Sequence, residues 1–494
     1  MAYKYALLFL ILIGFQQPAK ADFALDQNST AAFKAIFELR FPEAKRLIAE
    51  EKRSNPGNGI TVLLENYMDY FYLLTSSNKA DYSKFKDKRS ARLDALEDND
   101  ETSPFYLFAQ ADVYIQSAVL KAKFGDYTYS VLDMRKGHKL LMKNAEKFPD
   151  FIPNQKSIGW LNVLVGAIPP SMKGVVGFFG VKGDLPTGLK QLQRLRGQLD
   201  GSMYSFYKDE VTFIIALANI DILKKKDNYA QLMSMAADMS DKSLLKSYLQ
   251  GYIAFKTGHT DVAIDRLMDA PQTSEYMDMP IINYWLANAK LCRMDRDADK
   301  YFLKFISENK GDSFIKESYL KIAYCAFLKK DIDGYNSYLN VVRTKGTAVD
   351  EKDKEALREA NDARPDEDLL RARFYFDGGY YDKALALLKG KPFTELKIVR
   401  DKTEYYYRFG RTYDAMENDT AALSNYQRAI NLGRATSYYY AANSALLSGL
   451  IYEKKRDFKK AAELFKLTLS MKNHEYQNSI DNQAKDGLSR VNAD

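Results

Sequence analysis

The chain has 494 residues, of which 46% are apolar and 28% are charged, a balance that supports a large core and excludes global disorder. Its two cysteines exclude a disulfide scaffold. The formal net charge of +7 comes from 72 Lys and Arg against 65 Asp and Glu spread along the chain, so the sequence has no clustered basic footprint for nucleic acid.

The N-terminus has the pattern of a cleavable signal peptide. Lys4 supplies a positive charge, Tyr5 to Phe15 is an apolar run of 11 residues, and Ala19 to Ala21 supplies an A-x-A cleavage site. A membrane span needs roughly 20 apolar residues, so an uncleaved anchor is the weaker interpretation. No cysteine follows the apolar run to carry a lipid. We therefore expect residues 1–21 to be removed after Ala21 and the mature protein to be exported, either periplasmic or secreted.

Residues 22–240 are expected to form an irregular helical region with one unusual hairpin. The stretch Ile158 to Val181 holds a single charge, Lys173, and therefore invites a membrane interpretation. Pro169-Pro170 and a run of glycines cut the stretch into pieces too short to cross a bilayer. We expect a buried helical hairpin, with peripheral membrane contact as the alternative. The glycines mimic a phosphate loop, but no G-K-S/T follows and no strand precedes them, so no nucleotide cofactor is expected.

Several short motifs stand out in residues 105–195. They are Gln116 to Leu120, Met134 to Lys139, Ile158-Gly159, Asn162, Pro169-Pro170, Gly177 to Asp184 and Gly188-Leu189. This segment resembles the eukaryotic inclusion-body-clearance family, also called the tetratricopeptide repeat protein 39 family, and Lys472 to Tyr476 is similar to that family's last helix pair. The resemblance implies a helical, non-enzymatic interaction protein. Members of the family are intracellular, whereas this chain carries an export pattern, so no cellular role is carried over.

Residues 241–494 repeat a helix-pair unit, most clearly at 405–435. This unit has seven residues at the spacing of the tetratricopeptide repeat, namely Tyr406, Phe409, Gly410, Tyr413, Ala422, Tyr426 and Ala429. Gly410 and Ala422 are small enough for the two helices of one hairpin to approach closely. The spacing recurs at 439–473 through Gly449, Tyr452, Ala461 and Phe465, and more weakly at 368–391 and 247–270. The repeats predict an all-α, tetratricopeptide-type solenoid of helical hairpins.

Arrays of this kind form a concave groove lined by the first helix of each hairpin, and they work by binding. We therefore expect a non-catalytic scaffold or adaptor of the cell envelope that binds a protein or peptide partner in the groove. Two other classes remain open. One is a helical solute- or glycan-binding component of an uptake system, and the second is a cell-wall lytic glycosidase.

No catalytic or metal site can be assembled from local motifs. Glu317 opens a Glu-Ser-aromatic triplet like that of lytic transglycosylases, but the downstream G-L-M-Q signature is missing and an ordinary repeat helix follows. The three histidines, His138, His259 and His474, form no pair at metal-ligand spacing. We expect no metal and no catalytic residue.

Three further features have more than one interpretation. Cys292 and Cys325 lie about one repeat apart in the sequence. They form either a disulfide between successive first helices or two separate buried thiols. The runs Tyr405 to Tyr407 and Tyr438 to Tyr440 can each place one or two rings in a core, which leaves the others for repeat interfaces or for peptide or glycan contact. Asp350 to Asp368 is dense in charges of both signs and predicts a solvated helix and a hinge.

Overall fold

The computed structural model describes residues 22–168, 183–225, 227–348 and 350–492. Within these ranges every regular element is helical, which confirms the predicted all-α class, and no helix there combines the length and the apolar character needed to cross a bilayer. The chain forms two compact units. Unit 1 contains residues 22–168, 183–249 and 270–279, and unit 2 contains residues 250–269 and 280–492.

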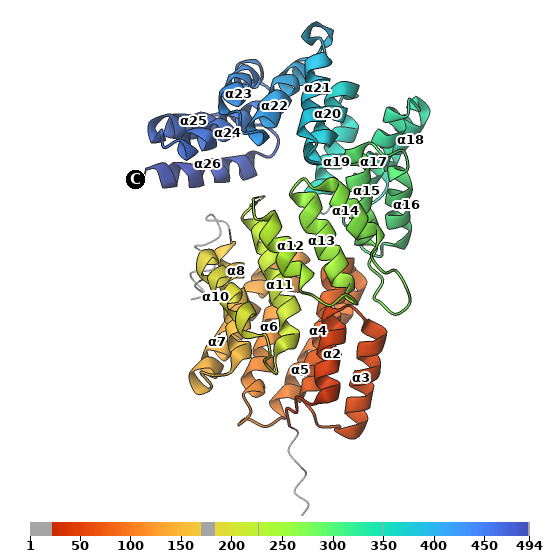
Figure 1. The fold of residues 1–494 in the computed structure, drawn as a ribbon, viewed down its shortest axis with the longest axis vertical. Coiled ribbons are helices and arrows are strands. Elements are labelled where there is room, and N and C mark those ends of the chain that lie inside the picture. Colours follow the sequence, from red (N-terminus) through yellow and green to blue (C-terminus); the bar gives the residue numbers. More distant parts are fainter. Residues whose placement is uncertain (1–21, 169–182, 226, 349, 493–494) are drawn as a thin grey trace, which may run out of the picture. The chain divides into compact units, whose positions relative to one another are not determined.

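Unit 1 consists of helices that pack mostly as sequential neighbours, coloured red to yellow-green in Figure 1. They are α2 (Gln27–Phe37), α3 (Phe41–Ser54), α4 (Ile60–Ser76), α5 (Lys79–Glu97), α6 (Phe105–Lys123), α7 (Tyr127–Lys147), α8 (Ile152–Gly166), α10 (Leu185–Gln198), η1 (Ser205–Tyr207), α11 (Lys208–Leu217), η2 (Ala218–Ile222) and α12 (Tyr229–Ala237). The core is aromatic, with the Phe33 ring stacked on Phe206 at 4.5 Å between centroids. Helix α13 (Leu244–Lys256) runs from unit 1 into unit 2.

Glycines allow a close helix approach in unit 1, between α8 and α10. A Cβ atom added at Gly188 would lie 2.8 Å from the backbone nitrogen of Val163, and one added at Gly159 would lie 2.8 Å from Cγ of Leu192. These distances are shorter than van der Waals contact, so the two helices can pack this closely only without side chains at both positions.

Unit 2 is a series of helical hairpins. Its helices are α14 (Thr260–Met268), α15 (Ile281–Arg293), α16 (Ala298–Glu308), α17 (Ile315–Leu328), α18 (Ile332–Thr344), α19 (Glu351–Asn361), α20 (Glu367–Asp377), α21 (Tyr381–Gly390), the short η3 (Phe393–Glu395), α22 (Val399–Ala415), α23 (Asp419–Gly433), α24 (Tyr440–Lys454), α25 (Phe458–Ser470) and α26 (Gln477–Val491). The pairs α15–α16, α17–α18, α20–α21, α22–α23 and α24–α25 form the hairpins, and α26 packs on α24 and α25. Figure 1 shows the last two hairpins and α26 in blue.

The hairpin turns repeat one backbone geometry. In four of these hairpins a residue with positive φ lies two positions before the second helix, at Lys330, Gly379, Glu417 and Arg456, and Gly258 has the same place between α13 and α14. In three of these turns the next residue, an Asp or Asn, caps the second helix through its side chain, at Asp331, Asn418 and Asp457. The left-handed residue reverses the chain and the polar cap starts the helix, so a short stretch of sequence closes each hairpin.

Candidate functional site

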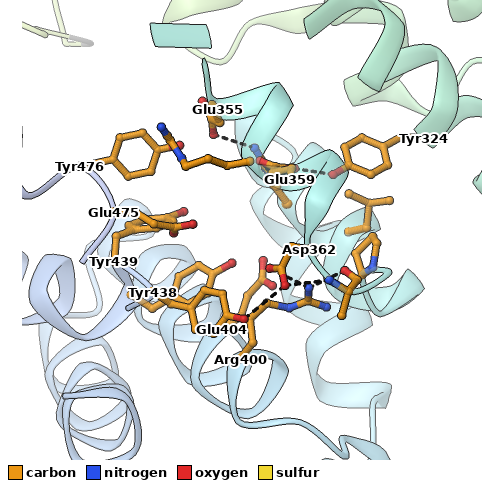
Figure 2. A pocket seen from close by; sticks show the side chains of 16 residues that line it. Tyr324, Glu355, Glu359, Asp362, Arg400, Glu404, Tyr438, Tyr439, Glu475 and Tyr476 are labelled. Atoms are coloured by element: carbon orange, nitrogen blue, oxygen red, sulfur yellow. Dashed lines mark hydrogen bonds and ion pairs between the residues drawn. The ribbon is translucent and has the colours of Figure 1, made fainter. Parts of the chain in front are cut away.

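Unit 2 contains a small pocket lined by tyrosines, carboxylates and arginines. The lining residues come from α17, α19, α20 and α22, from the segment that follows α19 and from the segments that lead into α24 and α26. Figure 2 shows them around a common space. About 60 Å³ of this space admits water. Because sites for drug-sized ligands measure about 300 Å³ or more, the pocket suits a few water molecules or the tip of one side chain.

One side of the pocket is an ion-pair network around Arg373 of α20. The guanidinium donates to both carboxylate oxygens of Glu359, at 2.9 and 3.1 Å, and to Glu355 at 3.3 Å. The Tyr324 hydroxyl donates to the same Glu359 carboxylate. Burial raises the pKa of Glu355, but the charges of Lys352 and Arg373 outweigh burial and lower that pKa to about 2. These carboxylates are therefore compensated by cations of the chain itself.

Arg400 of α22 lines the pocket and binds the segment that follows α19. Its guanidinium donates to Asp362 at 3.1 Å and to the backbone carbonyl oxygens of residues 363 and 364 at 2.6 and 2.9 Å. One turn further along α22, the Glu404 carboxylate accepts two hydrogen bonds from Arg408, at 2.8 and 3.0 Å. Burial disfavours the charge of both arginines, but the neighbouring carboxylates outweigh it and raise their pKa values. Asp362 and Glu404 thus have partners as well.

The remaining side of the pocket is aromatic and also contains the Glu475 carboxylate. The Tyr439 and Tyr476 rings meet edge to face with centroids 5.1 Å apart, and the Arg358 guanidinium lies 4.9 Å from the Tyr476 centroid. Figure 2 shows Glu475 beside Tyr439. Glu475 is half-buried, and burial raises its pKa against the opposing effects of the Tyr439 backbone and Arg358. The charge of Arg358 acts on Glu475 in return, so this carboxylate also has a cation of the chain nearby.

The residues of the repeat signature lie at hairpin interfaces and not in this pocket. Ala422, Tyr426, Ala429, Ala461 and Phe465 are fully buried, Phe409 is buried, and Tyr406, Tyr413 and Tyr452 are half-buried. Gly410 faces the Tyr426 ring, and a Cβ atom at Gly449 would lie 2.6 Å from the Phe465 ring. The hairpins of unit 2 therefore pack as a tetratricopeptide-type solenoid.

Two predicted features of the pocket region need correction or completion. The charged run Asp350 to Asp368 does not form a freely solvated helix, because α19 buries Asp353, Ala356 and Ala360, and the boundary between the units does not fall there. Sequence reasoning missed that this run supplies the half-buried Glu355 and Glu359 to the pocket, for which the high charge density was the available signal. The run Tyr438 to Tyr440 lies in the pocket wall, with Tyr440 buried and the other two half-buried.

Glu317 and the two cysteines are buried in the helices of unit 2. The Glu317 carboxylate accepts a hydrogen bond from the Tyr284 hydroxyl, and its backbone N–H donates to Asp353 at 2.9 Å, so it belongs to the packing of α17. Cys292 in α15 and Cys325 in α17 are separate thiols, with no bridge between them. Burial raises the pKa of both, that of Cys325 to about 12.

The unusual hairpin is only partly described. Residues 158–166 belong to α8, whereas residues 169–182, with the paired prolines and Gly174, Gly177 and Gly180, lie outside the described residues. Within the described ranges no three His, Cys, Asp or Glu side chains are grouped so that they could hold a metal ion.

Comparison with known proteins finds only distant structural likeness. No family model matches the chain, and no curated protein matches its sequence. Similar solved structures include a chain of the APC/C hetero-tetramer Cut9-Hcn1 (TM-score 0.26, 12% identity, 93% of this chain and 95% of that chain covered), the TPR domain of P58(IPK) (0.22, 13%, 87% and 97%) and the yeast Tom70 (0.24, 12%, 94% and 95%). TM-scores this low carry no argument about this chain.

Proposed function

We propose that this chain is a non-catalytic scaffold or adaptor that binds a protein partner through the pocket of unit 2. The observation that carries the proposal is the convergence of five tyrosines and three arginines in one partly open pocket. Tyrosine and arginine are the residues most enriched at the energetic centres of protein interfaces, because each combines a large contact area with directional hydrogen bonds. The small volume favours one anchoring side chain of a partner over an enclosed small molecule.

The charge pairing in the pocket favours binding over catalysis. The carboxylates of Glu359, Asp362 and Glu404 each lie against an arginine, and a general acid or base needs a proton that it can exchange with a substrate. A fixed network of ion pairs is instead suited to presenting a rigid surface, since its side chains lose little entropy when a partner binds.

We further propose that the adaptor works outside the cytosol, in the cell envelope. The support is the sequence of residues 1–21, which has a charged start, an apolar run and an A-x-A site. Peripheral membrane contact through Ile158 to Val181 stays a prediction, as does the relation of residues 105–195 to the inclusion-body-clearance family. Neither is needed for partner binding by unit 2.

Site-directed photo-crosslinking in the native host tests the proposal. A p-benzoylphenylalanine is placed at Tyr438, which is half-buried in the pocket wall, and as a control at Glu463, which is exposed on α25 and does not line the pocket. We expect a discrete protein adduct from position 438 and none from position 463, with the mature chain starting at Asp22. No adduct, or the same adducts from both positions, would overturn partner binding at the pocket, and an intact Met1 would overturn export.

A further inference from the structure

We propose that the exposed face of α7 docks unit 1 on the surface of an anionic lipid membrane. This inference goes beyond the proposed function, which concerns unit 2. It is carried by the packing of α7, by its exposed apolar side chains and by its unpaired charges. The α7 face, as we call it, consists of seven exposed residues, namely Tyr129, Leu132, Arg135, Lys136, Lys139, Met142 and Lys143.

The inner side of α7 is fixed on α6, so the opposite side is held outward. A Cβ atom added at Gly137 would lie 2.9 Å from Cγ1 of Ile115, which shows how closely the two helices approach. The Ser130 hydroxyl donates to the backbone carbonyl oxygen of Ala118 at 2.7 Å. At 100° per residue, the seven residues of the α7 face fall within an arc of about 140°. They therefore form one continuous stripe along the helix.

Large apolar side chains are exposed on α7. Tyr129 is 59% exposed, Met142 45% and Leu132 38%, and Tyr127 in the first turn is 60% exposed. Single exposed apolar residues are ordinary, but four of them on one helix form a patch that is stabilised when something covers it. A tyrosine suits the headgroup region of a bilayer, because its ring can lie among apolar groups while its hydroxyl stays hydrated.

The charges of the α7 face are positive and lack carboxylate partners. The side chains of Arg135, Lys139 and Lys143 form no ion pair or hydrogen bond with any described residue. Asp133, one of the two acids in α7, is buried and already pairs with two other cations of unit 1, at 2.7 Å each. The cations of the face are therefore available to an external anionic surface, as in juxtamembrane basic segments.

The composition of the face favours a lipid surface over a protein partner. Lysine is depleted at the centres of protein interfaces, and its ammonium is compact and strongly hydrated. At a membrane surface the ammonium stays hydrated among the headgroups while neighbouring apolar side chains enter the acyl boundary. A helix that mixes lysines with exposed tyrosine, leucine and methionine matches this second setting.

The neighbourhood of α7 agrees with a membrane setting. Val131 and Met134, on the side of α7 that faces α8, pack with Ile168 around the buried Val165. Val165 and Ile168 belong to the stretch from residue 158 to residue 181, which has one charge in 24 residues. The basic face and the start of this nearly uncharged stretch therefore lie beside each other in unit 1.

Co-sedimentation of the mature chain with sucrose-loaded vesicles tests the proposal. The vesicles contain phosphatidylcholine alone or phosphatidylcholine with about 30% phosphatidylglycerol, in about 0.1 M salt. Because each basic residue near an anionic surface strengthens binding roughly fivefold, we expect at least about 30-fold tighter binding to the anionic vesicles. In about 1 M salt, where the Debye length is about 3 Å, this difference should largely disappear.

A triple substitution locates the electrostatic contact. Arg135→Gln, Lys139→Gln and Lys143→Gln together remove three charges from the α7 face and should weaken binding to the anionic vesicles roughly 100-fold. Circular dichroism of the variant checks that its helices are intact.

A control with the same change in net charge separates the face from the charge of the whole chain. Lys45→Gln, Arg53→Gln and Lys86→Gln remove three exposed cations from α3 and α5. This control should weaken binding by less than about threefold, because these residues lie outside the α7 face.

A second variant tests the apolar part of the contact. Tyr129→Ser with Leu132→Ser keeps every charge of the face and removes two exposed apolar side chains. Since burial of such side chains in the acyl boundary adds to the electrostatic attraction, the variant should bind the anionic vesicles about tenfold more weakly.

Several results would overturn the proposal. Equal binding to the two kinds of vesicle, binding to neither, or equal losses in the α7 triple variant and its control would exclude docking by the α7 face. A Tyr129→Ser, Leu132→Ser variant that binds like the parent would show a basic patch for any polyanion and not a lipid-docking face. Binding to polyglutamate in place of the vesicles would identify an acidic polypeptide as the occupant.

Discussion

Lys156 and Asp112 form an ion pair of 2.7 Å inside unit 1, where both side chains are almost fully buried. Glu210 lies 3.4 Å from the same ammonium, and the Tyr67 hydroxyl donates to Asp112 at 2.6 Å. The ammonium also lies 4.8 Å from the centre of the Tyr207 ring. Burial disfavours the charged amine, but the two carboxylates outweigh burial and raise the pKa of Lys156. One buried lysine therefore compensates two acids that come from α6 and α11.

Replacing this lysine should destabilise unit 1 strongly. Lys156→Met removes the cation and leaves Asp112 and Glu210 buried without one, which should cost about 3–5 kcal/mol in the free energy of unfolding. Urea denaturation followed by circular dichroism measures the loss. Lys143→Met, at an exposed position of α7, is the control and should change the free energy by less than about 0.5 kcal/mol. Similar losses for the two variants would contradict the role given to Lys156.

The stability of unit 1 should fall as the pH rises from about 4.5 to 7. Burial raises the pKa of Glu210 from 4.5 to about 7, with Lys156 opposing and Asp112 adding to the shift. Between these pH values the folded chain holds a proton that the unfolded chain has released. The free energy of unfolding therefore decreases as the pH increases. The full shift corresponds to about 3 kcal/mol.

A Glu210→Gln variant isolates this contribution. Asp209, whose pKa burial raises to about 6, titrates in the same window, so the difference between the parent and the variant is the quantity to measure. We expect the melting temperature of the variant to vary less between pH 4.5 and 7.5 than that of the parent. Parallel curves would show that Glu210 does not titrate in this range.

The hairpins of unit 2 could be predicted because their packing rules are local. Gly410 and Gly449 lie at fixed distances along the chain from the aromatic residues they face, Tyr426 and Phe465, so the spacing alone reports the contact. The turn at Glu417 gives a weaker signal, since its left-handed residue is not the glycine that usually marks such a turn.

The pocket could not be predicted because its residues meet only after the hairpins stack. Arg373 and Glu359 are on different helices, and Glu475 reaches Tyr439 from a loop 36 residues further along the chain, without a motif that links them. The charged run around α19 was visible as charge density, but a dense mixture of signs looks the same whether it is solvated or paired within a pocket. Lys156 gave no signal either, because nothing local to it indicates that two distant acids will surround it.

Both cysteine thiols should be unreactive in the folded protein. Cys292 and Cys325 are separate and buried, and burial raises the pKa of both, so neither has an accessible thiolate at neutral pH. We expect Ellman's reagent to titrate no thiol in the native mature chain and two per chain in guanidinium chloride without reductant. Two reactive thiols only after reduction would instead show a disulfide between Cys292 and Cys325.

A glycine in the turn between α22 and α23 should stabilise unit 2. Glu417 is exposed and has φ of 59°, a left-handed conformation that costs a residue with a side chain roughly 1 kcal/mol or more. Glu417→Gly removes that cost, but glycine also increases the conformational entropy of the unfolded chain. The net increase in the free energy of unfolding should be about 0.5–1 kcal/mol. Glu417→Ala also removes the carboxylate but keeps the strain, so it should give no such gain in the same denaturation experiment.

A methyl group should have opposite effects at two helical glycines. A Cβ atom at Gly449 would lie 2.6 Å from the ring of Phe465, which is fully buried and cannot move without shifting its neighbours. Gly449→Ala should therefore cost about 1–3 kcal/mol. At Gly197 in α10 no atom lies within 4 Å of the added Cβ, so Gly197→Ala should gain about 0.5–1 kcal/mol from helix propensity alone. Urea denaturation of the two variants measures both changes in the free energy of unfolding. A stabilising Gly449→Ala would show that the α24–α25 hairpin can accept a methyl group at this position, contrary to the prediction.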